Sequence, residues 1–226
     1  FPKETRWGYF PSVLVGWAIS KENFLANVNS IDELKLRASY GQSGIDNVGN
    51  YDYYSGYGIT IPYIQGGPYL FGSTYYNALG LTNLANPALT WEKMTISNLG
   101  LDFSFLKRKI YGEANVFYRK REGIPATRLS SIPTSFGAPL PKENLNSQNN
   151  RGFDLMLGTA GKSADFRWDI SGNISWNRAK WDHYEEPEYT EEWQIRTNKN
   201  SGNWTDRSIG YLTDGLFTSQ EEINNL

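Results

Sequence analysis

The sequence contains no cysteine and a single histidine, His183, among its 226 residues. The absence of cysteine excludes a disulfide framework, a thiol nucleophile and a cysteine-based metal site. His183 lies in the acidic segment DHYEEPEYTEE, where a lone histidine is usually solvated rather than catalytic. No Ser-His-Asp set and no metal-binding cluster is visible either. We therefore expect no enzymatic activity, no bound metal and no cofactor.

Long apolar runs are also missing, and so is an excess of charge of one sign. No segment approaches the ~20 apolar residues of a transmembrane helix, and no signal peptide opens the chain. This leaves a β-barrel possible, because the strands of such a barrel are only half apolar. The 22 Lys and Arg nearly balance the 24 Asp and Glu, giving a net charge of -2. Nothing in this balance indicates nucleic acid or an anionic membrane surface as a partner.

Aromatic residues and glycine are abundant. The chain has 15 Tyr, 8 Trp, 11 Phe and 22 Gly. This composition favours β-structure with long, structured loops. It is typical of a membrane barrel with aromatic girdles, and also of a surface that recognises sugars.

Apolar and polar residues alternate in about six segments, as expected for strands with one apolar face. The clearest is DFRWDISGNISWN at 165–177, and RGFDLMLG at 151–158 is the weakest. The others cover residues 7–19, 33–41, 91–105 and 109–121. Each is near or above the ~9–11 residues with which a tilted strand crosses a bilayer.

The connections between these segments alternate strictly between short and long. Tight turns are expected at 106–108 and 160–164, and residues 20–31 are short, with one helical turn expected around 23–25. This rhythm indicates an antiparallel barrel with short periplasmic turns and long extracellular loops. The long connections cover residues 42–89, 122–147 and 178–226.

The order of aromatics along the segments favours the barrel over its alternative, a soluble β-sandwich module that binds carbohydrate. Aromatics fall near both strand ends, with aliphatic or small residues between them, as in membrane girdles. The two hypotheses make opposite predictions for 165–177. In the barrel, Arg167, Asp169 and Asn173 point inward. The residues that then face lipid, rather than a solvent-excluded core, are Phe166, Trp168, Ile170, Ile174 and Trp176.

About six strands are fewer than the eight of the smallest membrane barrels. The chain ends in TSQEEINNL, where Ser219 and Glu222 form a capping-box pattern that predicts a helix rather than a closing strand. We expect residues 1–226 to be one partial barrel domain within a longer protein.

The segments WGYFPSVLVGWAIS, LKLRASYGQSG and NPALTWEKMTISNLGLDFSFLKRKIYGEANVFYRK closely resemble the C-terminal barrel region of SusC/RagA-type TonB-dependent transporters. So do NSQNNRGFDLML and GYLTDGLFTSQEEI, in the family's order. The resemblance implies an all-β fold: an antiparallel transmembrane barrel of roughly 22 strands, of which this chain supplies a part, with an N-terminal plug in the lumen.

The same resemblance implies a function in the outer membrane of Bacteroidota-type bacteria. Such proteins import glycans, or oligopeptides in some members, with energy relayed through TonB. A SusD-like lipoprotein usually closes over the extracellular side. The plug and the TonB box are not part of this sequence, so energy coupling rests on the resemblance alone.

Aromatic residues in two long loops are the candidate substrate contacts. Aromatic faces stack on sugar rings, and tyrosine hydroxyls add hydrogen bonds at low entropy cost. The alternative is that these rings only pack the loops on themselves and on their neighbours. The candidates are Tyr51, Tyr53, Tyr54, Tyr57, Tyr63, Tyr69, Tyr75 and Tyr76 in the first loop and Trp193 and Trp204 in the last.

Two charged groups are expected to have simpler roles. The acidic run at 185–192 lacks the ligand spacing and the turn glycine of a calcium loop, so we expect a solvated loop. The inward polar residues of the strands would line the lumen, where they satisfy one another and the plug. They are Lys35, Arg37, Glu113, Arg119, Arg167 and Asp169.

Overall fold

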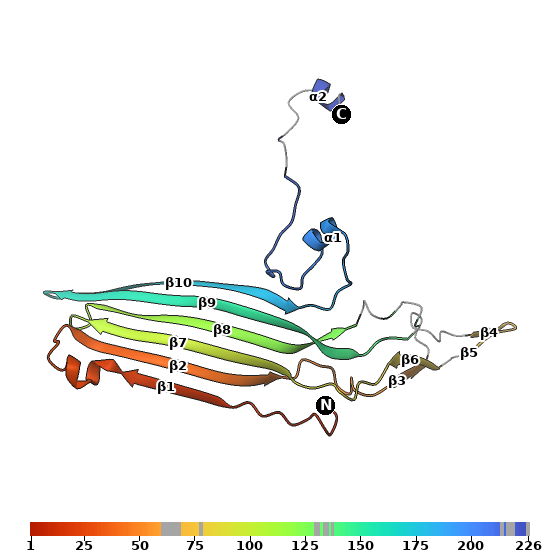
Figure 1. Cartoon of the computed structure of the whole chain (residues 1–226), viewed down its shortest axis with the longest axis horizontal. Helices are drawn as coiled ribbons and strands as arrows, with labels where there is room; N and C mark the ends of the chain where they lie inside the picture. The colour runs from red at the N-terminus through yellow and green to blue at the C-terminus, as the bar shows by residue number, and fades with distance from the viewer. Residues whose placement is uncertain are drawn as a thin grey trace.

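The computed structural model places most of the chain in one antiparallel sheet of long strands (Figure 1). The strands lie side by side in the order β1-β2-β7-β8-β9-β10, which is also their order along the chain. Their bounds are β1 Ser12–Ala18, β2 Ile31–Ile45, β7 Glu92–Phe105, β8 Ile110–Thr127, β9 Lys142–Ser163 and β10 Phe166–His183. The structure describes residues 1–59, 69–76, 79–128, 132, 136, 138–212, 215 and 220–224.

Shorter elements occupy the connections. Two small hairpins form in the first long loop, where β3 pairs with β6 and β4 with β5. In the described part of the chain, no helix is long and apolar enough to cross a membrane. The short elements are β3 Gly56–Ile59, β4 Tyr69–Phe71, β5 Thr74–Tyr76, β6 Leu79–Asn83, the 3-10 turns η1 Ile19–Lys21 and η2 Asn23–Leu25, and the helices α1 Glu192–Thr197 and α2 Gln220–Asn224.

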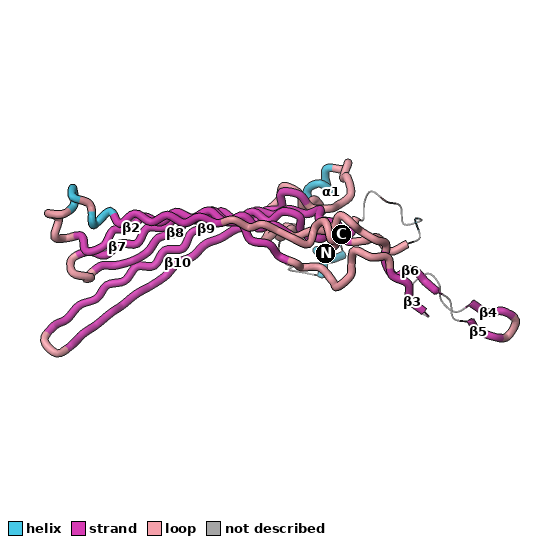
Figure 2. The backbone as a smooth tube through the Cα atoms, turned by 90° about the horizontal axis from the view of Figure 1, so that it is seen from below, coloured by secondary structure: helices cyan, strands magenta, loops and turns pink. Residues whose placement is uncertain are grey.

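All short connections lie at one end of the sheet and all long ones at the other, as the loop rhythm predicts (Figure 1). The β3–β6 and β4–β5 hairpins extend the long-loop end well beyond the sheet (Figure 2). The helical turn expected around residues 23–25 is present as η2. The capping-box residue Ser219 lies outside the described residues, although the helix predicted there is present as α2.

The predicted strands are present, but several of their bounds differ. The segment predicted to be the weakest strand belongs to the longest one, β9, which has 22 residues and begins at Lys142 instead of Arg151. Residues 146–150 are polar on both faces, so alternation gives no signal there, and backbone pairing with β8 and β10 forms the strand. At the other edge, β1 begins only at Ser12, five residues after Trp7.

The two tight turns use left-handed backbone at residues other than glycine. Leu106, Lys107 and Arg108 have φ angles of 57°, 60° and 62°. The turn between β9 and β10 lies later than predicted, at residues 164–165 rather than 160–164, with Ala164 at φ 50°. The two strands therefore continue to Ser163 and from Phe166, which makes this hairpin project beyond the others (Figure 2).

The pairing register gives the sheet one apolar and one polar face. Side chains at paired positions lie on the same face of a sheet. The polar row of paired positions runs through Lys35, Asp102, Glu113, Met156 and Asn173, with Met156 as its one apolar member. The adjacent apolar row runs through Trp17, Leu36, Leu101, Ala114, Leu155 and Ile174.

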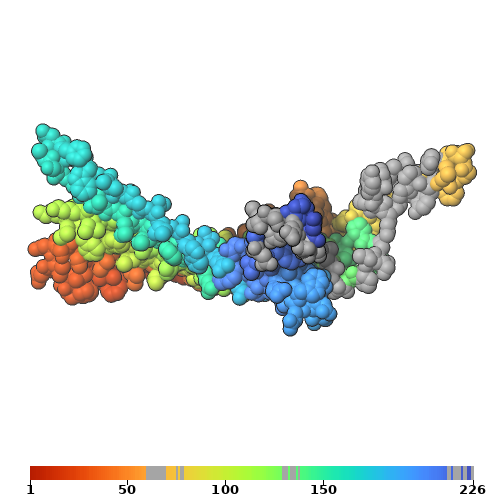
Figure 3. Space-filling model, turned by 90° about the horizontal axis from the view of Figure 1, so that it is seen from above, coloured from red at the N-terminus to blue at the C-terminus, as the bar shows by residue number. Residues whose placement is uncertain are grey.

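The apolar face is not covered by another layer of protein. The only fully buried apolar side chain among the described residues is Leu89, whereas Ile170 and Ile174 are 66% and 60% exposed. In the space-filling view of Figure 3 the strands lie open at the left of the picture. A sandwich module would bury this face in a core, so that alternative is wrong. Exposed apolar area costs about 25 cal/mol per Å² in water, and a lipid environment removes this cost.

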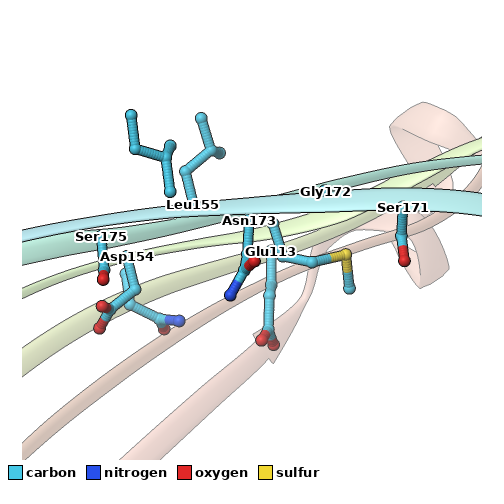
Figure 4. A pocket seen from close by; sticks show the side chains of 10 residues that line it. Glu113, Asp154, Leu155, Ser171, Gly172, Asn173 and Ser175 are labelled. Atoms are coloured by element: carbon cyan, nitrogen blue, oxygen red, sulfur yellow. The ribbon is translucent and has the colours of Figure 1, made fainter.

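The five residues predicted to face lipid from β10 are all exposed, and the polar residues between them belong to the opposite face. Figure 4 shows Asn173, Ser171 and Ser175 on one side of the sheet and Leu155, the partner of Ile174, on the other. The exposed fractions are 68% for Phe166, 36% for Trp168, 66% for Ile170, 60% for Ile174 and 47% for Trp176.

Candidate functional site

The polar face is organised around Arg37 on β2. Its Nη2 lies 2.6 Å from Asp102 Oδ1 and its Nε lies 2.8 Å from Asp102 Oδ2, a bidentate pair between β2 and β7. Nη2 also donates to Asn115 Oδ1 at 3.2 Å, and Glu113 Oε2 lies 3.9 Å away, both on β8. Charge-assisted bidentate pairs combine strength with fixed geometry. Arg37 thus ties three strands together on this face.

A polar hollow lies next to this cluster, across β8, β9 and β10. It has a volume of about 450 Å³, and Figure 4 shows Glu113, Asp154 and Asn173 pointing to the same side of the sheet. Among the described residues, Asp154 has no ion-pair partner, so the hollow carries uncompensated negative charge. This surface suits polar solutes or a polar protein segment rather than lipid.

A second ion pair lies on the polar face near the long-loop end of the sheet. Arg121 Nε on β8 lies 2.6 Å from Glu92 Oε1 on β7, and the Glu92 side chain is buried. Gly123, two residues after Arg121, is left-handed with φ 71°, and its carbonyl accepts a hydrogen bond from Asn144 Nδ2 at 2.7 Å. These contacts fix the point where β8 and β9 leave the main sheet and continue into the loop region.

Three of the predicted tyrosines gather in the first loop. The Tyr53 and Tyr54 rings have centroids 4.3 Å apart, and Tyr51 lies 6.5 Å and 6.4 Å from them. A hydrogen bond between the hydroxyls of Tyr54 and Tyr53 raises the pKa of Tyr53. Tyr51 and Tyr54 remain 71% and 57% exposed, so the cluster packs on itself and still presents ring surface to solvent.

A cavity of about 360 Å³ adjoins this cluster and is lined by Phe1, Asp46, Asn50, Tyr51 and Tyr53, among others. Asp52 fixes the backbone of Gly49, which also lines the cavity, because its Oδ2 accepts the Gly49 N–H at 2.8 Å and lies 3.4 Å from Lys142 Nζ. Tyr51 has a φ of 63°, a left-handed conformation that is uncommon outside glycine. Such strain often marks a binding loop.

The other predicted tyrosines do not join this cluster. Tyr57 on β3 is 69% exposed, and Tyr76 on β5 meets Phe71 edge-on at 5.8 Å. Tyr69 pairs through its backbone with Tyr76, and Tyr75 pairs likewise with Leu70. Tyr63 lies outside the described residues. The predicted set is therefore spread over the loop and its hairpins.

The two candidate tryptophans of the last loop have different surroundings. Trp193 lies on α1 and is 56% exposed. Trp204 lies instead against β9 and β10, with its ring 4.9 Å from Arg151 Cζ and 4.4 Å from Arg178 Cζ. The rings of Tyr51 and Tyr53 pack against each other and against Tyr54, and among the described residues they do not stack on either tryptophan.

The acidic run predicted to be a solvated loop has one residue with a structural role. Glu186 accepts the backbone N–H groups of Asn200 at 2.7 Å and Ser201 at 2.8 Å. Burial by itself raises the pKa of Glu186, but these hydrogen bonds outweigh it and hold the pKa below its usual value. Glu186 therefore fixes the return of the last loop towards the sheet, and the solvated-loop expectation was wrong for this residue.

Comparison with known proteins identifies this two-faced sheet. The family model "TonB dependent receptor-like, beta-barrel" matches residues 1–222. The chain belongs to this family. Its sheet is a portion of an antiparallel transmembrane barrel, and it lies in the outer membrane.

Two curated relatives share this region of the receptor barrel. The TonB-dependent receptor SusC of Bacteroides thetaiotaomicron is 38% identical over 179 residues, or 78% of this chain. A TonB-dependent receptor of Formosa agariphila is 29% identical over 186 residues. The chain spans only 17% of the length of each.

Among solved structures, the RagAB peptide importer in its closed-closed state has the same fold, with a TM-score of 0.66 and 24% identity. The match covers 80% of this chain and 19% of that one. SusC, at 38% identity, assigns this barrel portion to the SusC/RagA type, and the RagAB importer shares its fold.

Sequence reasoning missed parts of the receptor's polar face. Asn115 and Asp154 share the inward parity with Glu113 and Asn173, so alternation alone could have placed both residues. The contact of Trp204 with Arg151 and Arg178 had no such signal, because it joins a loop to strands far away in the chain.

Proposed function

We propose that the full-length protein imports glycans or oligopeptides across the outer membrane by a TonB-dependent mechanism. The observation that carries this proposal is the division of one sheet into an apolar face and a charged face centred on Arg37 and Asp102. The family membership, the relative SusC and the fold shared with a peptide importer support it. Residues 1–226 act as one partial barrel domain, and the plug and the TonB-contacting segment belong to the protein outside it.

In this proposal the protein is a transporter rather than an enzyme, and a SusD-like lipoprotein covers its extracellular loops. The charged face lines the lumen, and the loops at the opposite end from the tight turns form part of the substrate chamber. The cavity beside Tyr51 and Tyr53, with exposed ring surface around it, supports a role for the first loop in substrate contact.

The import step is tested by deleting the gene in its host and measuring uptake of a panel of neutral oligosaccharides and a panel of short peptides. Uptake of one panel should fall on deletion and return with the full-length gene. Purified receptor should leave the imported compound chemically intact, and a tagged receptor should co-purify with a lipoprotein. Unchanged uptake of both panels contradicts the import proposal.

The substrate contact is tested with the double variant Tyr51→Ala/Tyr54→Ala in the full-length receptor. Each stacked ring contributes about 0.5–1.5 kcal/mol, so we expect roughly tenfold weaker binding of the imported compound, measured by calorimetry in detergent. Tyr51→Phe/Tyr54→Phe keeps the rings and should bind nearly as well. Tyr211→Ala, at a fully exposed position, is the control. Wild-type affinity in the alanine variant would show that the rings only pack the loop.

A further inference from the structure

A second charged cluster lies on the apolar side of the sheet, just beyond its aromatic rim. Phe153 on β9 and Trp176 on β10 are paired positions, and their rings stack with centroids 6.2 Å apart. Two residues further towards the long-loop end, Arg151 and Arg178 are also paired positions. Because residues two apart on a strand point to the same face, Arg151 and Arg178 lie on the outward face with Phe153 and Trp176. Two residues correspond to about 7 Å along a strand.

Two arginines at directly paired positions repel each other unless something compensates them. Trp204 provides part of the compensation, with its ring 4.9 Å from Arg151 Cζ and 4.4 Å from Arg178 Cζ. Lys180 Nζ lies 5.9 Å from the same ring. Arg178 Nε also donates to both carboxylate oxygens of Asp206 at 3.1 Å.

The cluster is held in place by backbone hydrogen bonds rather than by chance contacts of long side chains. The Trp181 N–H donates to the carbonyl of Asn203 at 3.0 Å, and the Thr205 N–H donates to the carbonyl of Ala179 at 2.9 Å. Trp204 is thereby fixed between two anchored neighbours, against the edge of β10 that does not pair with β9. Its indole ring keeps both guanidinium groups on the outward face.

The cluster retains positive charge after its internal pairing. Three cations, Arg151, Arg178 and Lys180, gather around the Trp204 ring, and only Arg178 pairs with a carboxylate, that of Asp206. Among the described residues, Arg151 and Lys180 have no carboxylate partner. On the same face, Lys120 stands in one row with Lys180, since both pair with Asn149, but Lys120 is neutralised by Glu122 at 2.7 Å. Asp182 accepts a hydrogen bond from the Asn149 amide.

We propose that Arg151, Arg178 and Lys180 bind the phosphate of an anionic lipid in the outer leaflet. A position about 7 Å outside an aromatic rim corresponds to the headgroup level, because aromatic girdles mark the interface. Guanidinium groups match phosphate oxygens bidentately. The cluster faces away from the lumen, so the transported compound does not reach it. The assignment is therefore independent of the substrate.

The test uses purified full-length receptor in neutral detergent, titrated with a phosphorylated lipid A, with its dephosphorylated form and with inorganic phosphate. The wild type should bind the phosphorylated lipid at least about tenfold more tightly than the dephosphorylated one, since the phosphate adds charge-assisted hydrogen bonds to the guanidinium groups. Equal affinity for both lipids overturns the proposal. Binding of inorganic phosphate as tight as that of the lipid also overturns it, because the cluster would then be a small-anion site.

Variants then locate the site. Arg151→Gln/Arg178→Gln should lose the preference for the phosphorylated lipid, whereas Arg151→Lys/Arg178→Lys should keep part of it. The matched control is Lys162→Gln/Arg167→Gln, another pair of directly paired cations on the same two strands, near their opposite end. Circular dichroism of the purified variants verifies that each of them still folds into the barrel. A folded glutamine variant that keeps the full preference contradicts the assignment to these residues.

Discussion

Gly100 gives the Arg37–Asp102 pair the space that it needs. Arg37 and Gly100 are paired positions on β2 and β7, and the guanidinium lies over the glycine. A Cβ atom at residue 100 would lie 2.5 Å from Asn115 Oδ1 and 3.0 Å from Arg37 Cζ. The absence of a side chain at one position thus permits an ion pair that joins three strands.

Gly100→Ala should lower the free energy of unfolding of the full-length barrel by about 1–3 kcal/mol, because overpacking displaces Arg37 from its partners. Denaturant titration in lipid vesicles measures the change. Gly172→Ala is the control, since a Cβ atom there meets nothing within 4 Å. Equal stability of the two variants would mean that Arg37 moves aside without losing its ion pair.

Single residues were predicted well where the strand parity determined their direction. Arg37 and Glu113 were expected on the polar face, and they come together there. Tyr51, Tyr53 and Tyr54 were expected only to share a loop, and their contact depends on the backbone course of residues 49–54. The net charge of -2 likewise gave no indication of a local group of cations on the outward face.

At the scale of elements, β10 shows how one strand serves two environments. Ile174 and Asn173 are adjacent in the chain, yet the first belongs to the apolar row with Leu155 and the second lines the polar hollow. The difference comes only from the two-residue period of the strand. A charge introduced at these two positions should therefore have very different costs.

Ile174→Lys should destabilise the folded barrel in lipid vesicles by about 2–4 kcal/mol, the cost of a lysine near the bilayer midplane. Asn173→Lys places the same side chain next to Glu113 and Asp154 and should cost much less. Denaturant titration of both full-length variants compares them directly. A larger cost for Asn173→Lys would reverse the assignment of the two faces.

The elements that alternation predicted are those that cross the membrane. Residues 165–177 and 109–121 were found because one of their faces meets lipid and the other does not. Where β9 extends beyond the bilayer, residues 146–150 are polar on both faces and no pattern is left. The β3–β6 hairpin was missed for a related reason, since its strands are only four and five residues long.

At the scale of the whole molecule, the sheet has two edges. β1 pairs only with β2, and β10 pairs with β9 and touches the loop at Trp204. In lipid, every unpaired backbone group costs several kcal/mol, which is why membrane sheets close into barrels. The edges of β1 and β10 therefore require further strands of the same barrel.

Residues 1–226 expressed alone should fail to give a heat-modifiable, protease-resistant barrel in detergent, whereas the full-length protein should give one. Electrophoresis with and without boiling tests this, with protease digestion as a second measurement. A protease-resistant species from the segment alone would mean that β1 and β10 pair with each other or with a second copy.

The length of β9 has a consequence for the kinetics of any solute held above the membrane. At about 3.3 Å per residue, its 22 residues span roughly 70 Å, against about 30 Å for the hydrocarbon core. Even with tilt, the wall continues far into the extracellular side. A molecule that dissociates beside such a wall stays close to the contacts that it has just left. Rebinding then competes with escape, so weak individual contacts suffice for long retention.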